Sequence, residues 1–230
     1  MNRFLWSGAA AALIFTACQA HAIPLGTLID SAGTIEVGDK LFSNFSLSNV
    51  TSQNSIPADP RDLEIEGFTN LLGEHGLLLS GFSVTLPDEE ASAALLFHLE
   101  YDVTVTDPSF QLSDIRHVFS TESNRGGGLS LITQAGFPPD VNGSMQSVVG
   151  FAGTGEPVHD DVNESTDLLD QVSSQHMLHA FEAHALRVNL TPVVLGSITT
   201  SSFEFTFSQT RTPIPEPATW PLLATGLVML

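Results

Sequence analysis

The chain has 230 residues, with 7 basic and 26 acidic side chains and a formal net charge of −19. This length fits one domain with a substantial core, and the acidic balance argues against nucleic acid, whose phosphates need a basic patch. Only 14% of the residues are charged, and there is a single cysteine. These values exclude a highly charged disordered chain, a disulfide framework and a zinc or iron–sulfur cluster built on cysteines.

Residues 1–22 are typical of a secretory signal peptide. Arg3 supplies one positive charge, an uncharged and mostly apolar run follows, and Ala20-His21-Ala22 has the small-x-small pattern that signal peptidase requires. The apolar run is shorter than the roughly 20 residues needed to span a bilayer. We expect cleavage after Ala22, with Ile23 as the first mature residue. An alternative is a lipoprotein signal in which Cys18 becomes the lipidated first residue.

Strand-like alternation recurs between residues 23 and 211, which we interpret as one folded domain. Residues 94–106 give the clearest case, because apolar and polar side chains alternate there over the whole length. Phenylalanines at positions 203, 205 and 207 alternate with polar residues in the same way. A third buried face is predicted for Leu78, Phe82, Val84 and Leu86, with a break at Gly81. Weaker strand candidates are residues 41–48, 63–68, 115–120, 129–134 and 188–195.

Turn signals separate these runs, among them Asp107-Pro108 and Asn142-Gly143. About eight to eleven short strands with such breaks predict an all-β fold, an antiparallel β-sandwich or jelly roll. Half-exposed alternation disfavours a parallel α/β sheet, whose strands are continuous apolar runs. Residues 160–185 are ambiguous: the sequence permits a short helix over 164–172 and either a helix or a strand over 176–187.

Three histidines, His176, His179 and His184, form a cluster of candidate metal ligands. On a helix, at about 100° per residue, His184 lies far from His179. On a strand, His176 and His184 share one face and His179 points the opposite way. Neither geometry brings all three together, so we expect histidines at the surface and no metal site.

Two acidic clusters offer oxygen ligands of the kind that calcium prefers. The first is Asp88-Glu89-Glu90, and the second combines Asp160-Asp161 with Asn163 and Glu164. Neither matches the spacing of an EF-hand, so the expected role is solvated loop charge. Calcium at the second cluster is the alternative.

The sequence contains no nucleophile elbow, no P-loop and no H-E-x-x-H zinc motif, and we predict no catalytic residues. Paired carboxylates for glycoside hydrolysis remain open, since 26 acidic residues are available and their pairing is spatial. Tyr101 is the only tyrosine, and both tryptophans lie in the terminal segments. An aromatic platform for sugar stacking in the domain would therefore have to use phenylalanine, which argues against a lectin-like function.

The last segment, residues 212–230, differs in composition from the domain. Its prolines make a stiff extended spacer, and the apolar stretch Ala218–Leu230 behind them is typical of a membrane-seeking tail. Pro215-Glu216-Pro217, followed by Ala-Thr and an apolar run, resembles the tail of the PEP-CTERM protein-sorting family. The resemblance implies export, transient tethering to the inner membrane and processing by an exosortase, in a Gram-negative bacterium of a kind that often makes exopolysaccharide.

The tail departs from that family's pattern in one respect. Only 13 uncharged residues follow Pro217, and no arginine or lysine follows Arg211. At about 1.5 Å per residue a helix of this length reaches roughly 20 Å, short of the roughly 30 Å hydrocarbon core. We therefore interpret the tail either as truncated at its C-terminus or as degenerate.

Together these features predict an exported, non-enzymatic protein of the cell surface or the exopolysaccharide matrix. Signal peptidase and exosortase are its expected processing partners, and no cofactor is expected. The alternatives are a secreted polysaccharide hydrolase and a calcium-dependent carbohydrate-binding or adhesion module.

Overall fold

The computed structural model describes residues 22–54, 59–86, 92–124, 126–136, 140–149, 158–188 and 194–212. Several predicted features lie outside them. These are the sorting motif Pro215-Glu216-Pro217, Cys18 and Ala20 of the signal segment, the acidic cluster Asp88-Glu89-Glu90 and most of the strand candidate 188–195. Ala22 is exposed, and Ile23 begins the first strand. Within the described ranges, no helix is both long enough and apolar enough to cross a membrane.

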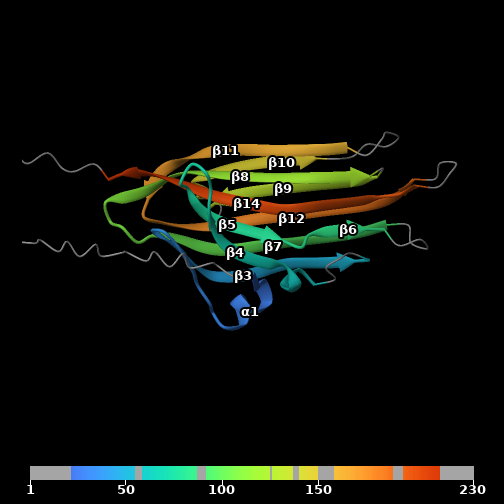
Figure 1. The fold of residues 1–230 in the computed structure, drawn as a ribbon, viewed down its shortest axis with the longest axis horizontal. Helices are drawn as coiled ribbons and strands as arrows, with labels where there is room; N and C mark the ends of the chain where they lie inside the picture. The colour runs from blue at the N-terminus through green and yellow to red at the C-terminus, as the bar shows by residue number, and fades with distance from the viewer. Residues whose placement is uncertain are drawn as a thin grey trace, which may run out of the picture.

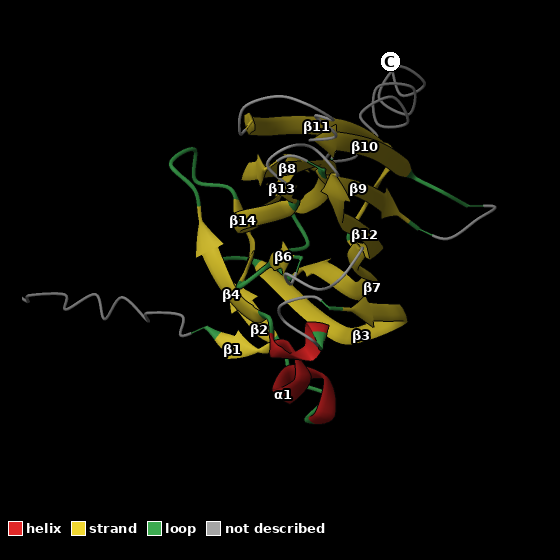
Figure 2. Cartoon of the chain, turned by 90° about the vertical axis from the view of Figure 1, so that its right-hand side faces the viewer, coloured by secondary structure: helices red, strands yellow, loops and turns green. Residues whose placement is uncertain are grey.

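Two antiparallel sheets pack face to face as a sandwich in the described part of the chain (Figures 1 and 2). Sheet A has the strand order β1, β4, β5, β14, β8, β11, and β6 pairs with β14. The bounds of its strands are β1 (Ile23–Pro24), β4 (Glu64–Thr69), β5 (His75–Ser80), β6 (Ser83–Thr85), β8 (Phe110–Asn124), β11 (Val158–Val172) and β14 (Ser197–Arg211).

Sheet B has the strand order β10, β9, β12, β7, β3, β2, and β13 pairs with β12. The bounds of its strands are β2 (Ile35–Val37), β3 (Lys40–Gln53), β7 (Ser92–Val105), β9 (Gly127–Ala135), β10 (Gly143–Val149), β12 (Ser174–Val188) and β13 (Val194–Leu195). The short helix α1 (Leu25–Asp30) lies against the 3₁₀ turn η1 (Pro60–Asp62) at one edge of the sandwich (Figure 2). The predicted all-β antiparallel sandwich is confirmed.

The core is built from the strand faces that carry the alternating apolar side chains. The buried face of β7 consists of residues 5% exposed or less: Ala93, Leu95, Phe97, Leu99, Tyr101, Val103 and Val105. The phenylalanines of β14, at 203, 205 and 207, are equally buried, so both of the clearest sequence predictions are confirmed. Phe181 of sheet B meets Phe203 of sheet A edge-on, with ring centroids 5.0 Å apart. Burial of each such ring contributes roughly 1.5–3 kcal/mol to folding.

One predicted face is wrong at its first residue. Leu77 and Leu79 of β5 are 1% and 0% exposed, whereas Leu78 lies on the outer face and is only partly buried. The strand breaks at Gly81, which has a φ of +88° that glycine adopts without steric cost. The break shifts the alternation by one residue, so that Phe82, Val84 and Leu86 point into the core as predicted.

The ambiguous segment is entirely strand where the structure describes it. The short helix over 164–172 is wrong, because these residues belong to β11, which pairs with β8 as far as Asp167 and again at Val172. Residues 176–187 lie in β12, between β7 and β9 at the centre of sheet B. Cross-strand pairing on an existing sheet thus overrides the local helical tendency of these residues.

Strand β3 is interrupted by two bulges at asparagines. Asn44 and Asn49 have φ values of +57° and +53°, and the pairing of β3 with β7 shifts register beside each of them. Asparagine tolerates this left-handed conformation better than most residues. The Nδ2 amides donate to β7, from Asn44 to Asp102 Oδ2 at 2.7 Å and from Asn49 to His98 Nδ1 at 3.0 Å. The bulges therefore bend β3 while holding it to its neighbour.

Candidate binding site at the β4–β5 turn

The predicted histidine cluster is divided by β12. His176 and His184 share the outer face of sheet B, and His179 points into the core, as expected for a strand. The expectation of surface histidines is wrong for His179, which is 0% exposed. Its burial follows from its place on the inward face of β12, where a hydroxyl group satisfies each of its two ring nitrogens.

The second acidic cluster is also divided between two faces. Along β11, Asp160 and Glu164 stand opposite inward-facing residues of β8, whereas Asp161 and Asn163 stand opposite outward-facing ones. Among the described residues, no group of three or more His, Cys, Asp or Glu side chains is placed to hold a metal ion. Residues 160–164 lie in β11 and not in the expected loop, and the alternation of the strand argues against the alternative of a calcium site there.

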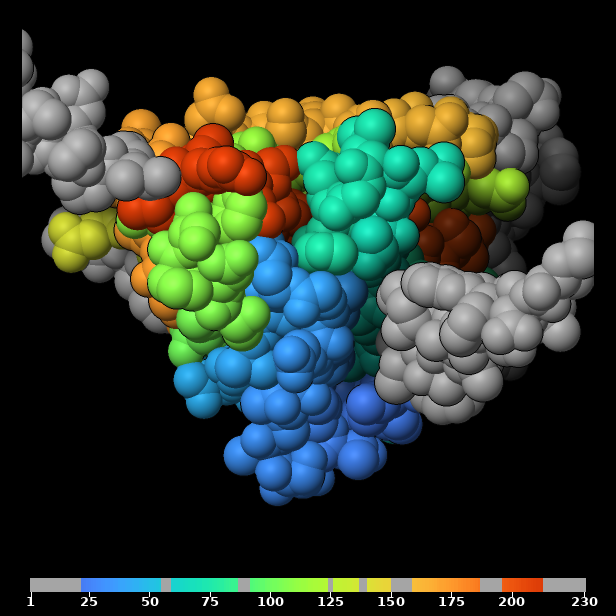
Figure 3. All heavy atoms as spheres, turned by 60° about the vertical axis from the view of Figure 1, so that its left-hand side comes forward, coloured from blue at the N-terminus to red at the C-terminus, as the bar shows by residue number. Residues whose placement is uncertain are grey.

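The turn between β4 and β5 is held in shape by Asn70. Its Oδ1 accepts hydrogen bonds from the backbone N–H groups of Leu72 and Glu74, both at 2.9 Å, and its Nδ2 donates to Glu74 Oε2 at 2.7 Å. Gly73 takes the positive φ of +83° that the turn requires. Leu71 and Leu72 project from this fixed turn, with Leu71 fully exposed and Leu72 73% exposed. Figure 3 shows the segment, in teal, standing beside the red end of β14.

A hollow of about 550 Å³, here called the outer hollow, opens beside the turn on the outer face of sheet A. In the strand register Phe68, Gly76, Thr206 and Arg116 form one row across β4, β5, β14 and β8. Gly76 lets β14 approach closely, since a Cβ there would lie 2.1 Å from the backbone oxygen of Phe205. The lining combines apolar and hydrogen-bonding side chains: Phe68, Leu71, Leu72 and Val118 with Thr69, Asn70, Arg116, Glu204 and Thr206.

Arg116 ties the outer hollow to its surroundings. Its Nε donates to Asn163 Oδ1 on β11 at 2.8 Å, and its guanidinium lies 3.7 Å from Glu74 Oε2 in the turn. These two contacts leave further N–H donors of the guanidinium for a ligand. The hollow therefore offers one fixed cation, one carboxylate at Glu204 and an apolar surface that includes Phe68.

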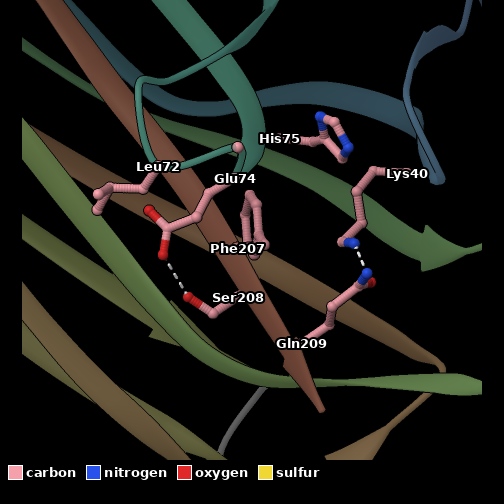
Figure 4. Close-up of a pocket in the computed structure, with 8 residues that line it drawn as sticks. Lys40, Leu72, Glu74, His75, Phe207, Ser208 and Gln209 are labelled. Atoms are coloured by element: carbon pink, nitrogen blue, oxygen red, sulfur yellow. Dashed lines mark hydrogen bonds between the residues drawn. The ribbon is translucent and has the colours of Figure 1, made fainter. Parts of the chain in front are cut away.

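A second, smaller pocket of about 250 Å³, here called the edge pocket, shares Leu72 with the outer hollow (Figure 4). Its lining comes from β3, the turn, β5 and β14: Lys40, Leu72, Gly73, Glu74, His75, Phe207, Ser208 and Gln209. Lys40 Nζ donates to Asp39 Oδ1 at 2.8 Å and to Gln209 Oε1. The pocket thus joins the start of β3 in sheet B to the end of β14 in sheet A.

Two carboxylates around these pockets stay ionised despite partial burial. Burial alone would raise the pKa of Glu74, but hydrogen bonds from Ser208 and Asn70 and the charge of Arg116 outweigh it and hold the pKa below 4.5. Burial would likewise raise the pKa of Asp39, but the hydrogen bond and charge of Lys40, a hydrogen bond from Gln209 and the nearby His75 hold it below 3.8. For Asp114, burial and the charges of Glu74 and Asp167 prevail over the hydrogen bonds of Ser208, and its pKa is raised above 3.8.

A chain of buried hydrogen bonds crosses the core from Tyr101 to the surface. Tyr101 Oη lies 2.8 Å from His179 Nε2, and His179 Nδ1 lies 3.0 Å from Thr133 Oγ1. Thr133 Oγ1 is 3.2 Å from His117 Nδ1, and His117 Nε2 is 2.6 Å from Ser147 Oγ. Ser147 Oγ then donates to Glu164 Oε2 at 2.6 Å. Because His117 and Glu164 belong to sheet A and the other members to sheet B, the chain also joins the two sheets.

The carboxylate of Glu164 sets the direction of every bond in this chain. A carboxylate only accepts, so Ser147 must donate to it and in turn accept from His117 Nε2. His117 Nδ1 then accepts from Thr133, which accepts from His179 Nδ1, and His179 Nε2 accepts from Tyr101. Ser147 and His117 are therefore polarised opposite to a serine nucleophile with its histidine base, in which serine donates to histidine.

Burial shifts the pKa of each ionisable group inside the chain toward its neutral form. Burial lowers the pKa of His117 below 6.5, against the opposing charge and hydrogen bond of Glu164. Burial, with the charge of His117, lowers the pKa of His179 well below 6.5. Burial also raises the pKa of Tyr101 well above 10.

Sequence reasoning missed most residues of the two pockets. Asn70, Arg116 and Glu204 are ordinary polar residues in the sequence, and only the strand register brings them together. One signal was available for the edge pocket, because Lys40 is the only lysine in the chain. Phe68 is the aromatic side chain in the lining of the outer hollow.

The fold defines the chain as an all-β antiparallel sandwich protein. No family model and no curated protein matches the chain. Among solved structures, it is similar to TmCBM61 in complex with β-1,4-galactotriose, at 12% identity and a TM-score of 0.34, over 71% of this chain and 88% of that one.

Two further solved structures match only over part of their own length. One is the enzymatically active domain of bacteriophage CBA120 tailspike protein 4, at 12% identity and a TM-score of 0.32, over 72% of this chain and 19% of that one. The other is an arabinose-bound MgGH51 α-L-arabinofuranosidase, at 11% identity and a TM-score of 0.26, over 74% of this chain and 23% of that one. At these TM-scores the matches do not bear on function.

Proposed function

We propose that this chain is an exported, non-catalytic protein of the cell surface or extracellular matrix, and that its β-sandwich binds polysaccharide in the outer hollow. The tail with Pro215, Glu216 and Pro217 is the proposed sorting signal, processed by an exosortase after signal peptidase has acted at Ala22. The sandwich is then the part that remains to act outside the inner membrane.

The composition of the outer hollow supports polysaccharide binding. A sugar ring presents apolar C–H faces and a rim of hydroxyl groups, and the hollow presents Phe68 and two leucines together with Arg116, Glu204 and Thr206. The Asn70 hydrogen bonds fix the turn before any ligand binds, which lowers the entropy cost of binding. A formal net charge of −19 repels polyanions, so we expect a neutral polysaccharide rather than an acidic one.

Isothermal titration calorimetry with neutral and acidic oligosaccharides tests this function. We expect binding of a neutral oligosaccharide, and we expect the double variant Leu71→Ser, Leu72→Ser to weaken it at least about tenfold, or about 1.4 kcal/mol. The matched control is Val148→Ser, an exposed apolar residue (55% exposed) on β10 of the other sheet, which should bind like the wild type. A second pair compares Glu204→Gln in the hollow with Glu182→Gln on the outer face of sheet B.

Three outcomes would contradict this function. If no neutral glycan binds, the proposed ligand class is wrong. If the control variants weaken binding as much as the variants in the outer hollow, the outer hollow is not the binding site. Release of new reducing ends from a bound polysaccharide would replace binding by hydrolysis.

The sorting proposal has its own test in the native host. Replacement of Pro215, Glu216 and Pro217 by alanine should leave the tail unprocessed, so that a longer chain accumulates in the inner membrane fraction. Processing that continues unchanged would count against the sorting role. Mass spectrometry of the mature N-terminus distinguishes a start at Ile23 from an acylated Cys18.

A further inference from the structure

The only lysine of the chain is buried between the two sheets. The Lys40 side chain is 1% exposed, although lysine is almost never fully buried unless it is paired. It stands at the start of β3 in sheet B, and its amine meets the side chain of Gln209 near the end of β14 in sheet A (Figure 4). The two residues are 169 positions apart, so the contact joins opposite ends of the folded domain.

Asp39 contacts both partners of this pair. Its carboxylate accepts a hydrogen bond from Lys40 Nζ at 2.8 Å, and it also takes a side-chain hydrogen bond from Gln209. A carboxylate only accepts, so the donor on Gln209 is its amide nitrogen, Nε2. The Asp39 carboxylate thus contacts both the Lys40 amine and the Gln209 amide nitrogen. The amide oxygen of Gln209 contacts the same Lys40 amine.

We propose that Lys40 and Gln209 react to form an isopeptide cross-link between sheet A and sheet B. Lys40 gives one proton to Asp39, and the neutral Nζ attacks Cδ of Gln209, forming the Nζ–Cδ bond. The Cδ–Nε2 bond then breaks as Nε2 takes up protons from Asp39 and from Nζ. Nitrogen leaves as ammonium, the carboxylate of Asp39 is restored, and no oxidant or other reactant is consumed.

The surroundings of the pair favour this reaction. Two groups that the fold holds in contact react as if at very high concentration, because folding has already brought them together and little entropy is lost in the reaction. Lys40 Nζ lies 2.8 Å from Asp39 Oδ1, so the proton passes directly between the two groups without another carrier. Both reacting residues line the edge pocket, which gives the departing ammonia a path to solvent.

The cross-link has a structural purpose in an exported domain. The single cysteine, Cys18, cannot form an internal disulfide, so no disulfide can constrain the unfolded chain. A bond between residues 40 and 209 closes a long loop, and the stabilisation expected from a cross-link in the chain-entropy treatment grows with loop length. This bond would join β3 to β14 directly.

Peptide mapping of the purified full chain tests the cross-link. Trypsin cuts after lysine and arginine, and a Lys40 amine joined to Gln209 is no longer a cleavage site. We expect one linked species, made of the peptide that ends at Arg61 and the peptide spanning residues 188–211, with the mass of their sum less one ammonia. Cleavage after Lys40, with the 188–211 peptide found free at its full mass, would overturn the proposal.

Amine labelling gives a second readout that does not depend on the protease. Because the chain has no other lysine, a reagent added after denaturation has only Lys40 and the N-terminal amine to modify. We expect no label on Lys40 in the cross-linked protein. Complete labelling of Lys40 would contradict the cross-link.

Three variants separate the reaction from the packing of the pair. Lys40→Arg keeps the positive charge without a reactive amine, and Asp39→Asn keeps a polar side chain without the proton acceptor. Both should give separate peptides, and Asp39→Asn should also restore labelling at Lys40. The matched control Glu64→Gln, an exposed carboxylate on β4, should keep the linked species. If the linked species persists in the Asp39→Asn variant, Asp39 is not the group that accepts the proton from Lys40.

Discussion

At the scale of single residues, the two buried histidines are held by their hydrogen bonds in defined protonation states. The chain from Tyr101 to Glu164 has one donor proton in each of its five bonds, and all of them point toward the carboxylate. Such a fully satisfied network specifies the packing around it, since any other arrangement leaves a polar group unpaired in the core.

We predict different tautomers for the two histidines. Near neutral pH, His117 should carry its proton on Nε2 and His179 on Nδ1, because each must accept at its other nitrogen. Long-range ¹H–¹⁵N correlation spectra of the imidazole rings distinguish the two forms. His176 serves as an internal reference, since its Nδ1 lies 2.6 Å from Asp102 Oδ1 and must carry a proton. The opposite tautomer at either buried ring would contradict the inferred direction.

The same histidines should make the fold sensitive to mild acid. Their pKa values lie below 6.5 in the folded state, so the unfolded chain binds more protons as the pH falls. Their contribution is fully present above about pH 6.5 and declines below it, by at most about 2 kcal/mol per histidine down to about pH 5. Asp39 and Glu74, with lowered pKa values, add a further loss below about pH 4.5.

Urea unfolding across this range measures the effect. The free energy of unfolding should fall between about pH 7.5 and about pH 5, and the variant His179→Gln should show a smaller fall because one titrating group is gone. A free energy of unfolding that stays constant down to about pH 5 would contradict the burial of neutral histidines.

At the scale of elements, the β4–β5 turn depends on one side chain. Asn70→Ala removes two acceptor contacts to backbone N–H groups and one donor contact to Glu74. We expect a loss of roughly 1–3 kcal/mol in the free energy of unfolding, together with weaker glycan binding. The control Gln146→Ala, whose side chain makes one long contact of 3.4 Å, should change stability by less than about 0.5 kcal/mol. If both variants lose the same free energy of unfolding, the Asn70 side chain does not hold the β4–β5 turn.

Strands that follow simple alternation are predictable from the sequence, and the others show why some are not. The face of β7 from Leu95 to Val105 can be read directly, because every second residue is apolar. At Leu78 the prediction fails by one position, since the break at Gly81 changes the alternation. For β11, the acidic and leucine-containing stretch after Asp161 suggests a helix until β8 is available as a partner.

At the scale of the whole molecule, the candidate site depends on pairings that the sequence does not carry. The outer hollow requires β4, β5, β14 and β8 to lie side by side, although these strands span residues 64 to 211. Lys40 and Gln209 meet only when the two sheets close on each other. Composition and terminal motifs predict the destination of the protein, whereas the residues of the proposed binding site and the proposed cross-link come together only in the assembled sandwich.

The two asparagine bulges of β3 also affect how neighbouring molecules meet. Beyond its pairing with β2 at residues 40–42, the outer side of β3 faces no further strand among the described residues. A straight edge strand with unpaired N–H and C=O groups could pair with the same strand of a second copy, and such pairing can begin a fibril. The bulges at Asn44 and Asn49 bend this edge of the sheet, and a bent edge disfavours pairing with a second copy of the chain.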